Sequence, residues 1–342
     1  MSATDSLMLR GYARARGASR SHVKHGVKSP VYLYESMLRP LILTLAKSGM
    51  AERFVTSTPV VRGISRRFVA GYEQRDVIEA VRRLNERGFE ATVSLLGEEV
   101  TDAAAAEADV REFEAYIDAV ARGGLRSHVS VKLTQLGLSF DRELALRSLT
   151  RVLECAQRAG TFVRVDMEDS RYTQPTLDIV RKARRSHDNV GAVIQAYLHR
   201  SEGDIEALAT EGVPVRIVKG AYREPAAVAL QQKRDVDAAY VRLVERYMQR
   251  AAPGAWLAVA THDERMIAAA LKAAARHAFG RERLEFQMLY GIRVDLQRRL
   301  LGEGQRVRVY VPYGSHWYPY LMRRLAERPA NLWFFLRGAI GR

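Results

Sequence analysis

Eight short apolar runs constrain the fold of this 342-residue chain more than any other feature. Continuous apolar runs of this length are typical of strands buried on both faces, as in parallel sheets. Segments with helical periodicity separate them, for example residues 142–159, 173–185, 226–250 and 263–277. Eight strand–helix units with right-handed crossovers predict a closed (β/α)8 TIM barrel. The runs cover residues 91–96, 129–133, 162–165, 192–196, 213–218, 256–260, 284–289 and 307–311.

The competing α/β architecture is an open, doubly wound sheet. Such a sheet usually carries a glycine-rich turn after its first strand, where a helix N-terminus receives a dinucleotide. Here the first run continues as LLGEEVTD, without the G-x-G-x-x-G pattern. A dinucleotide, if one binds, is therefore expected to bind in another way.

The segments before the first run predict an N-terminal extension of the same domain. We expect a basic, flexible arm over residues 1–30, helices within residues 31–88, and the catalytic barrel over residues 89–342. The expected helices cover residues 31–48, 51–72 and 75–87, and Gly88 fits the left-handed position that follows a helix. No stretch before the barrel is long and apolar enough to span a membrane, because Glu35, Arg39 and Pro40 interrupt the best candidate.

Net charge and cysteine content exclude several classes of function. The formal charge of +15 favours polyanionic partners but is spread along the chain, and no nucleic-acid-binding motif accompanies it. We therefore expect a cytoplasmic protein with no nucleic-acid partner, and leave open a peripheral contact with anionic lipid at the inner face of the membrane. The single cysteine rules out an internal disulfide framework and a cysteine-based metal site.

Polar side chains cluster where the predicted strands end. In a barrel the C-terminal ends of the strands carry the active site. A buried charge without a partner is costly, so these residues indicate either a functional mouth or a structural ion-pair network. Lysine and arginine occupy the places a cation would need, so we expect an anionic ligand and no metal. The residues are Lys132, Asp166, Gln195, Arg216, Lys219, Tyr222, Thr261, His262, Glu285, Gln287 and Tyr310.

A helix predicted over residues 318–327 follows the eighth run. Tyr320, Arg323, Arg324 and Glu327 lie three and four residues apart and therefore share one face. Guanidinium groups bind carboxylates in a planar, bidentate fork. The pair next to a tyrosine suggests a clamp for an amino-acid carboxylate, although a solvated arginine pair would show the same spacing.

With these motifs in view, the chain resembles the monofunctional, FAD-dependent proline dehydrogenases over residues 35–331. The resemblance rests on the order of short motifs, each placed at a strand end or on the last helix. Residue 223 departs from it, because an arginine follows KGAY where relatives carry an aromatic or aliphatic residue. The motifs are LLGE at 95–98, VSVKLTQLG at 129–137, VRVDMED at 163–169, VIQAYL at 193–198, VRIVKGAY at 215–222, ATHD at 260–263, EFQMLYG at 285–291, VYVPYG at 309–314 and YLMRRLAE at 320–327.

The resemblance implies a distorted barrel with FAD over the strand ends and the last helix covering the substrate. It assigns catalytic roles to Lys132, Asp166, Arg216, Tyr310, Tyr320, Arg323 and Arg324. Of these, Lys132, Tyr310, Tyr320, Arg323 and Arg324, together with Leu289, would bind proline, with the two arginines on its carboxylate. The cofactor would contact Gln195, Arg216, Lys219, Tyr222, Thr261, His262 and Glu327, with Arg216 near the flavin N5.

The implied reaction moves a hydride from L-proline to the flavin and gives Δ1-pyrroline-5-carboxylate, the first step of proline catabolism. A quinone would then accept the electrons, and a pyrroline-5-carboxylate dehydrogenase could receive the product. The bulk of Tyr320 implies selectivity for proline over 4-hydroxyproline.

Two other readings of the residues stay open at this point. Lys132 or Lys219 could form an imine, as in a Schiff-base lyase or aldolase. A non-catalytic basic barrel could bind an anionic partner, but that reading leaves the polar strand ends unexplained.

Overall fold

The architecture is seen in a computed structural model that describes residues 65–97 and 100–327, with side chains up to residue 324. The predicted basic arm and the helices predicted at residues 31–48 and 51–64 lie outside the described residues. Within them, no helix is long and apolar enough to cross a membrane. The same residues contain no cluster of three or more His, Cys, Asp or Glu side chains that could hold a metal ion.

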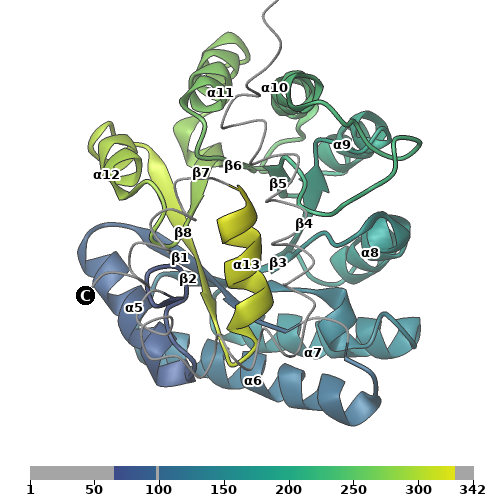
Figure 1. Cartoon of the computed structure of the whole chain (residues 1–342), viewed down its shortest axis with the longest axis vertical. Coiled ribbons are helices and arrows are strands. Elements are labelled where there is room, and N and C mark those ends of the chain that lie inside the picture. The colour runs from purple at the N-terminus through teal and green to yellow at the C-terminus, as the bar shows by residue number, and fades with distance from the viewer. Residues whose placement is uncertain (1–64, 98–99, 328–342) are drawn as a thin grey trace, which may run out of the picture.

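Eight parallel strands form a closed barrel in chain order, as the apolar runs predict. The last strand closes the sheet by pairing with the first, with Val93 opposite Val311. Figure 1 shows the strands at the centre of a ring of helices. The strands are β1 (Glu90–Leu95), β2 (Ser127–Val131), β3 (Val163–Val165), β4 (Val190–Gln195), β5 (Val215–Val218), β6 (Leu257–Ala260), β7 (Leu284–Leu289) and β8 (Arg306–Tyr313).

Amphipathic helices cover the outside of the barrel. Aspartates that follow strand ends also begin helices: the side chains of Asp169 and Asp263 accept the backbone N–H groups of Arg171 and Arg265. The helices are α5 (Gln74–Glu86), α6 (Ala103–Arg122), α7 (Arg142–Arg158), α8 (Ser170–Arg184), α9 (Ser201–Thr210), α10 (Lys233–Arg250), α11 (Glu264–Arg276), α12 (Val294–Gly302) and α13 (Trp317–Glu327), with 3-10 turns at Leu133–Leu136 and Arg281–Arg283.

The strands alternate between a polar interior and an apolar outer face. Arg216 lies between Val215 and Ile217, and the neighbouring valine and isoleucine are fully buried. The polar side chains of β5, β7 and β8 bond to strands that are not their neighbours, so they point into the barrel. The outward apolar residues pack under the helices and form the main core. The interior is therefore a polar layer enclosed by an apolar one.

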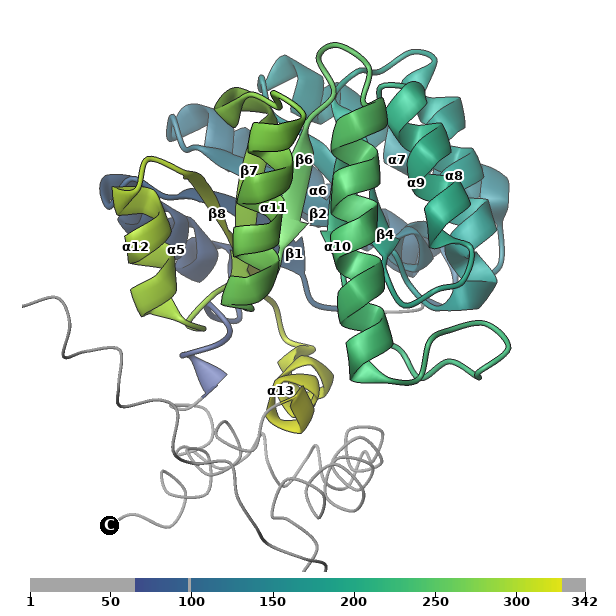
Figure 2. The same cartoon turned by 90° about the horizontal axis from the view of Figure 1, so that it is seen from above.

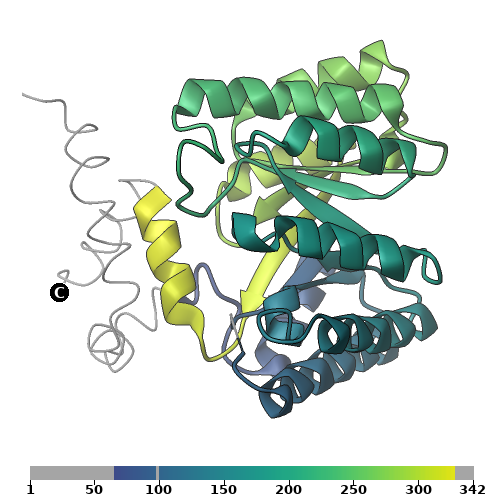
Figure 3. The same cartoon turned by 90° about the vertical axis from the view of Figure 1, so that its right-hand side faces the viewer.

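Helix α13 lies at one end of the barrel, apart from the ring of helices. It crosses the middle of the ring in Figure 1, and the two perpendicular views in Figures 2 and 3 both place it beyond the strands. Because α13 follows β8, this is the end toward which all eight parallel strands run. The last helix thus covers the barrel mouth.

Three predicted segments adopt another structure than the one expected. Residues 66–72 form turns rather than helix, since Gly71 has φ of +153° and the Ala70 N–H bonds to the Pro312 carbonyl. Residues 226–232 are a loop before α10, because this segment pairs with the chain near Leu198 instead. Leu133 leaves the second strand and begins a 3-10 turn that ends at Gly137, where φ is +105°.

Candidate active site

A cavity of about 670 Å³ lies between the strand ends and α13. Cofactor and ligand sites usually enclose about 300–1,000 Å³. Seven lysine and arginine side chains line the cavity against three carboxylates, so its field favours an anionic ligand. Of the residues predicted at the strand ends and on the last helix, all line it except Glu285 and Glu327. Glu285 is the second residue of β7 and so lies away from the strand end, and the side chain of Glu327 lies outside the described residues.

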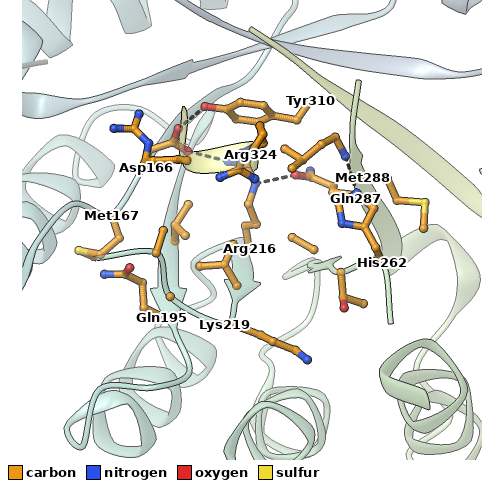
Figure 4. Close-up of a pocket in the computed structure, with 18 of the residues that line it drawn as sticks. Asp166, Met167, Gln195, Arg216, Lys219, His262, Gln287, Met288, Tyr310 and Arg324 are labelled. Atoms are coloured by element: carbon orange, nitrogen blue, oxygen red, sulfur yellow. Dashed lines mark hydrogen bonds and ion pairs between the residues drawn. The ribbon is translucent and has the colours of Figure 1, made fainter. Parts of the chain in front are cut away.

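Arg216 is the central cation of the cavity and is held by residues of β2 and β7 and by Asp166, which directly follows β3. Its Nη1 lies 2.6 Å from Asp166 Oδ1, its Nη2 lies 3.0 Å from Ser130 Oγ, and its Nε lies 2.5 Å from Gln287 Oε1. Figure 4 shows Arg216 between Asp166 and Gln287. The side chain is 5% exposed, so its position is fixed by these bonds rather than by solvent.

Asp166 joins Arg216 to Tyr310. The hydroxyl of Tyr310 donates to Asp166 Oδ2 over 2.9 Å (Figure 4), and the guanidinium of Arg216 lies 5.4 Å from the centre of the Tyr310 ring. Burial, reinforced by the charge of Asp166, raises the pKa of Tyr310 above its usual value. The tyrosine therefore stays protonated and acts as a donor to the carboxylate.

Lys219 is engaged by two carboxylates at the rim of the cavity. Its Nζ lies 2.5 Å from Asp237 Oδ1 and 3.5 Å from Asp263 Oδ2. Burial works to raise the pKa of Asp237, but hydrogen bonds from Lys219 and Lys233 bring it below its usual value. A Schiff-base nucleophile has to be a free amine in an apolar pocket, so this paired lysine does not favour the lyase reading.

Backbone contacts fix the orientation of Gln195 and His262. Gln195 Nε2 donates to the Glu168 carbonyl over 2.8 Å, which leaves its Oε1 as the acceptor for a ligand. His262 Nε2 accepts the Leu289 N–H over 3.0 Å, so a neutral ring carries its proton on Nδ1. One acceptor and one donor are thus set at the ends of β4 and β6, on either side of β5, and Thr261 lines the cavity beside His262.

Gly220 lets the loop after β5 reach the cavity. Its φ is +119°, and a Cβ there would lie 2.3 Å from the Tyr197 ring. Only glycine fits this combination of backbone conformation and close packing. The Tyr197 ring thereby supports the segment that brings Lys219 and Tyr222 to the cavity wall.

The helix over the mouth contributes Tyr320, Arg323 and Arg324 to the same cavity. The Arg324 guanidinium lies 5.1 Å from the centre of the Tyr320 ring, a cation–π distance. Tyr320 is buried, and Lys132 and Leu289 face the cavity from the barrel side. The predicted arginine pair therefore faces a ligand site and is not simply a solvated surface pair.

Ser130, Gln287 and Asp237 hold Arg216 and Lys219, yet none of them is among the catalytic, substrate or cofactor residues predicted from the sequence. In the sequence, Gln287 stands out only as a polar residue in an apolar run. Its alternation with Phe286 and Met288 was the available signal that it points inward. Asp237 lies within the helix predicted over residues 226–250, and nothing in the sequence places it beside Lys219.

Comparisons with known proteins agree with this geometry. The family model described as proline dehydrogenase matches residues 77–337. Proline dehydrogenase 1 of Bacillus subtilis is 40% identical over 304 residues, which cover 89% of this chain and 99% of that protein. Proline dehydrogenase of Deinococcus radiodurans is 37% identical over 313 residues, covering 90% of this chain and 99% of that protein.

A solved structure shares the fold. Proline utilization A from Bdellovibrio bacteriovorus, inactivated by N-propargylglycine, aligns with a TM-score of 0.74 and 25% identity. The alignment covers 89% of this chain but 38% of that longer one.

Proposed function

The chain belongs to the proline dehydrogenase family and is an enzyme of proline oxidation, the first step of proline catabolism; we propose that it uses FAD and forms Δ1-pyrroline-5-carboxylate. The observation that carries the proposal is the position of Arg323 and Arg324. They face the cavity that also contains Arg216, so substrate and cofactor sites adjoin.

The described residues fit a flavin dinucleotide, the cofactor class that the family implies. The cavity has the volume and positive charge for it, and the Gln195 and His262 hydrogen-bonding groups are already oriented. We assign Arg216, Gln195, Thr261 and His262 to the ring and its linker, and Lys219, Tyr222 and Glu327 to the remainder. When bound, FAD supplies the acceptor for a hydride from the substrate.

Proline lies under α13 in this proposal. Arg323 and Arg324 bind its carboxylate in the bidentate manner of guanidinium groups, and Lys132 adds a third positive charge. Tyr320, Tyr310 and Leu289 enclose the ring and exclude water. Fixing the carboxylate orients the carbon that is oxidised, and such positioning supplies much of the rate in a reaction between two bound partners.

The protein's own groups set the electrostatics of the site. Arg216 places a fixed positive charge where negative charge develops on reduction, and Asp166 and Tyr310 keep it there. The substrate amine loses one proton before it is oxidised, because a protonated amine has no lone pair to assist.

Tyr320 is proposed to set the substrate range. Its ring is buried beside Arg324, so little room is left for a hydroxyl on the substrate ring. Comparable catalytic efficiency on L-proline and 4-hydroxyproline would contradict this role.

The electron acceptor and the partners complete the proposal. We assign a quinone as acceptor and a pyrroline-5-carboxylate dehydrogenase as the enzyme that receives the product. The net charge of +15 supports a peripheral contact with anionic lipid, since each basic residue near such a surface contributes about 1 kcal/mol.

An absorption spectrum before and after anaerobic L-proline tests the proposal. Protein purified with FAD should show a flavin band that proline bleaches. A flavin band that proline leaves unchanged would support FAD as the cofactor and reject proline as the substrate. No flavin band, together with a borohydride-trapped adduct on a lysine, would replace the proposal with Schiff-base chemistry.

A further inference from the structure

Gln287 binds the Nε edge of Arg216, and the proposed function assigns Gln287 no contact with substrate or cofactor. Gln287 Oε1 accepts from Arg216 Nε over 2.5 Å, across the barrel from β7 to β5. Asp166 and Ser130 each take one further N–H. Among the described residues these bonds use three of the five guanidinium N–H groups, so two remain directed elsewhere.

Gln287 is in turn bound by the buried Glu285, which pairs with Arg308. Its Nε2 donates to Glu285 Oε1 over 2.5 Å, two residues earlier on the same inward face of β7. Glu285 is completely buried and is bound by Arg308, whose Nε lies 3.0 Å from both carboxylate oxygens. Arg308 Nη1 donates to the Ala91 carbonyl over 2.8 Å. The chain of bonds therefore ends on the barrel backbone.

The bridge defines which way the Gln287 amide points. Its oxygen has to face the Arg216 guanidinium, and its NH2 group has to face the Glu285 carboxylate. In the reverse orientation the NH2 group would face the guanidinium, which only donates, and the oxygen would face the carboxylate, which only accepts. Burial works to raise the pKa of Glu285, but Arg308, Gln287 and Arg306 together outweigh it and hold the pKa below the usual value, so Glu285 stays an anion. An ionised neighbour keeps the amide in one orientation.

We propose that Gln287, backed by the Glu285–Arg308 pair, is a positioning residue that holds Arg216 with its remaining N–H groups toward the flavin. This inference rests on the proposed function, because it requires a flavin in the cavity. It adds a residue that acts through Arg216 and touches neither substrate nor the reacting atoms. The barrel interior thereby becomes part of the cofactor site.

Gln287→Met tests the bridge with little change of side-chain volume. It removes the acceptor for Arg216 Nε and leaves both Asp166 and Arg308 in place. We expect FAD to bind about tenfold more weakly, because a hydrogen bond to a charged group is lost. We also expect the flavin equilibrium to shift about tenfold toward the oxidised form, which is about 30 mV for a two-electron couple. The KM for proline should change less than threefold.

Tyr247→Phe is the matched control. The Tyr247 hydroxyl is buried and lies 2.8 and 3.0 Å from the carbonyls of Val213 and Trp256, away from the cavity lining. It removes a buried polar group without touching the chain to Arg216, so FAD affinity and potential should stay at the wild-type values. If Gln287→Met does not fold, Gln287→Leu replaces it and should show the same weaker FAD binding, because leucine also lacks an acceptor for Arg216 Nε.

The outcomes separate this inference from the proposed function. If the wild type binds no FAD, the proposed function fails. If the wild type binds FAD and Gln287→Met keeps the wild-type affinity and potential, only the positioning role is rejected. Equal shifts in Gln287→Met and Tyr247→Phe would also reject it, since they would reflect a general loosening of the barrel.

Discussion

Asp166 and Arg216 form a buried ion pair, 2.6 Å long, at the mouth of the barrel. The two side chains are 13% and 5% exposed, so neither charge is well solvated without the other. Breaking a buried pair by removing one partner costs about 3–5 kcal/mol, much of it from the charge left behind. The pair is therefore important both for stability and for the position of Arg216.

Asp166→Asn should lower the free energy of unfolding and the rate of proline oxidation together. The amide keeps the shape of the carboxylate but removes its charge, so we expect about 3 kcal/mol less stability and about a 100-fold lower kcat. Urea denaturation and single-turnover bleaching of the flavin measure the two effects. Tyr310→Phe, which leaves the ion pair intact, should lose less than half as much stability; an equal loss would contradict the assignment.

Replacing the arginine pair on α13 should affect substrate and spare the cofactor. In Arg323→Met and Arg324→Met we expect the KM for proline to rise about 100-fold, because a charge-assisted bond worth about 1.5–3 kcal/mol is lost at each position. FAD content should match the wild type. Spectral titration with proline checks this, and loss of FAD in either variant would argue that α13 supports the cofactor instead.

Gly220→Ala should weaken the binding of the cofactor. An added Cβ would lie 2.3 Å from the Tyr197 ring, and φ of +119° is unfavourable for alanine. The loop that carries Lys219 therefore has to move. We expect FAD affinity to fall at least about tenfold, a loss of about 1.4 kcal/mol, as measured by fluorescence titration. Gly203→Ala on α9 is the control, because no atom lies within 4 Å of its Cβ position; it should bind FAD normally.

The barrel itself could be predicted from the sequence because strand burial leaves a local signature. Each of the eight apolar runs became a strand, and residues such as Lys132 and Tyr310 could be placed at the mouth from their position after or late in a run. The pairing of these side chains could not be predicted. Arg216 meets Gln287 across 71 residues of sequence, and only closure of the barrel brings them together.

The loop before α10 also could not be predicted from the sequence. The segment before α10 has helical composition, yet backbone bonds to Tyr197 and His199 hold it in an extended loop. Local propensity could not reveal this, because the competing partner lies about 30 residues earlier. The helix that follows this loop carries Asp237, which binds Lys219 at the rim of the cavity.

Asp109 should make the protein less stable as the pH rises through mildly acidic values. Burial raises the pKa of this carboxyl from 3.8 to about 6, only partly offset by the hydrogen bond that Gln135 Nε2 donates over 3.4 Å. Between pH of about 4 and about 6 the folded state therefore binds more protons at Asp109 than the unfolded state. The free energy of unfolding falls with rising pH in that window, and the contribution is constant above it.

The groups around Asp109 determine how that titration is to be measured. Glu112 on the same helix opposes ionisation, whereas His316 before α13 and Lys132 after β2 favour it. Asp109→Asn removes the titration and keeps an acceptor for Gln135, so the stability of the variant relative to the wild type should rise as the pH increases from about 4 to about 6.

Asp263→Asn is the control, because the pKa of this carboxyl is shifted in the opposite direction. The pKa of Asp263 is lowered to about 2 by Arg265, so its contribution is lost only below pH of about 4. Urea denaturation across this range should give a flat difference for Asp263→Asn and a sloping one for Asp109→Asn. A flat difference for both would mean that Asp109 is ionised in the folded state at pH 4 and that its burial does not govern its protonation.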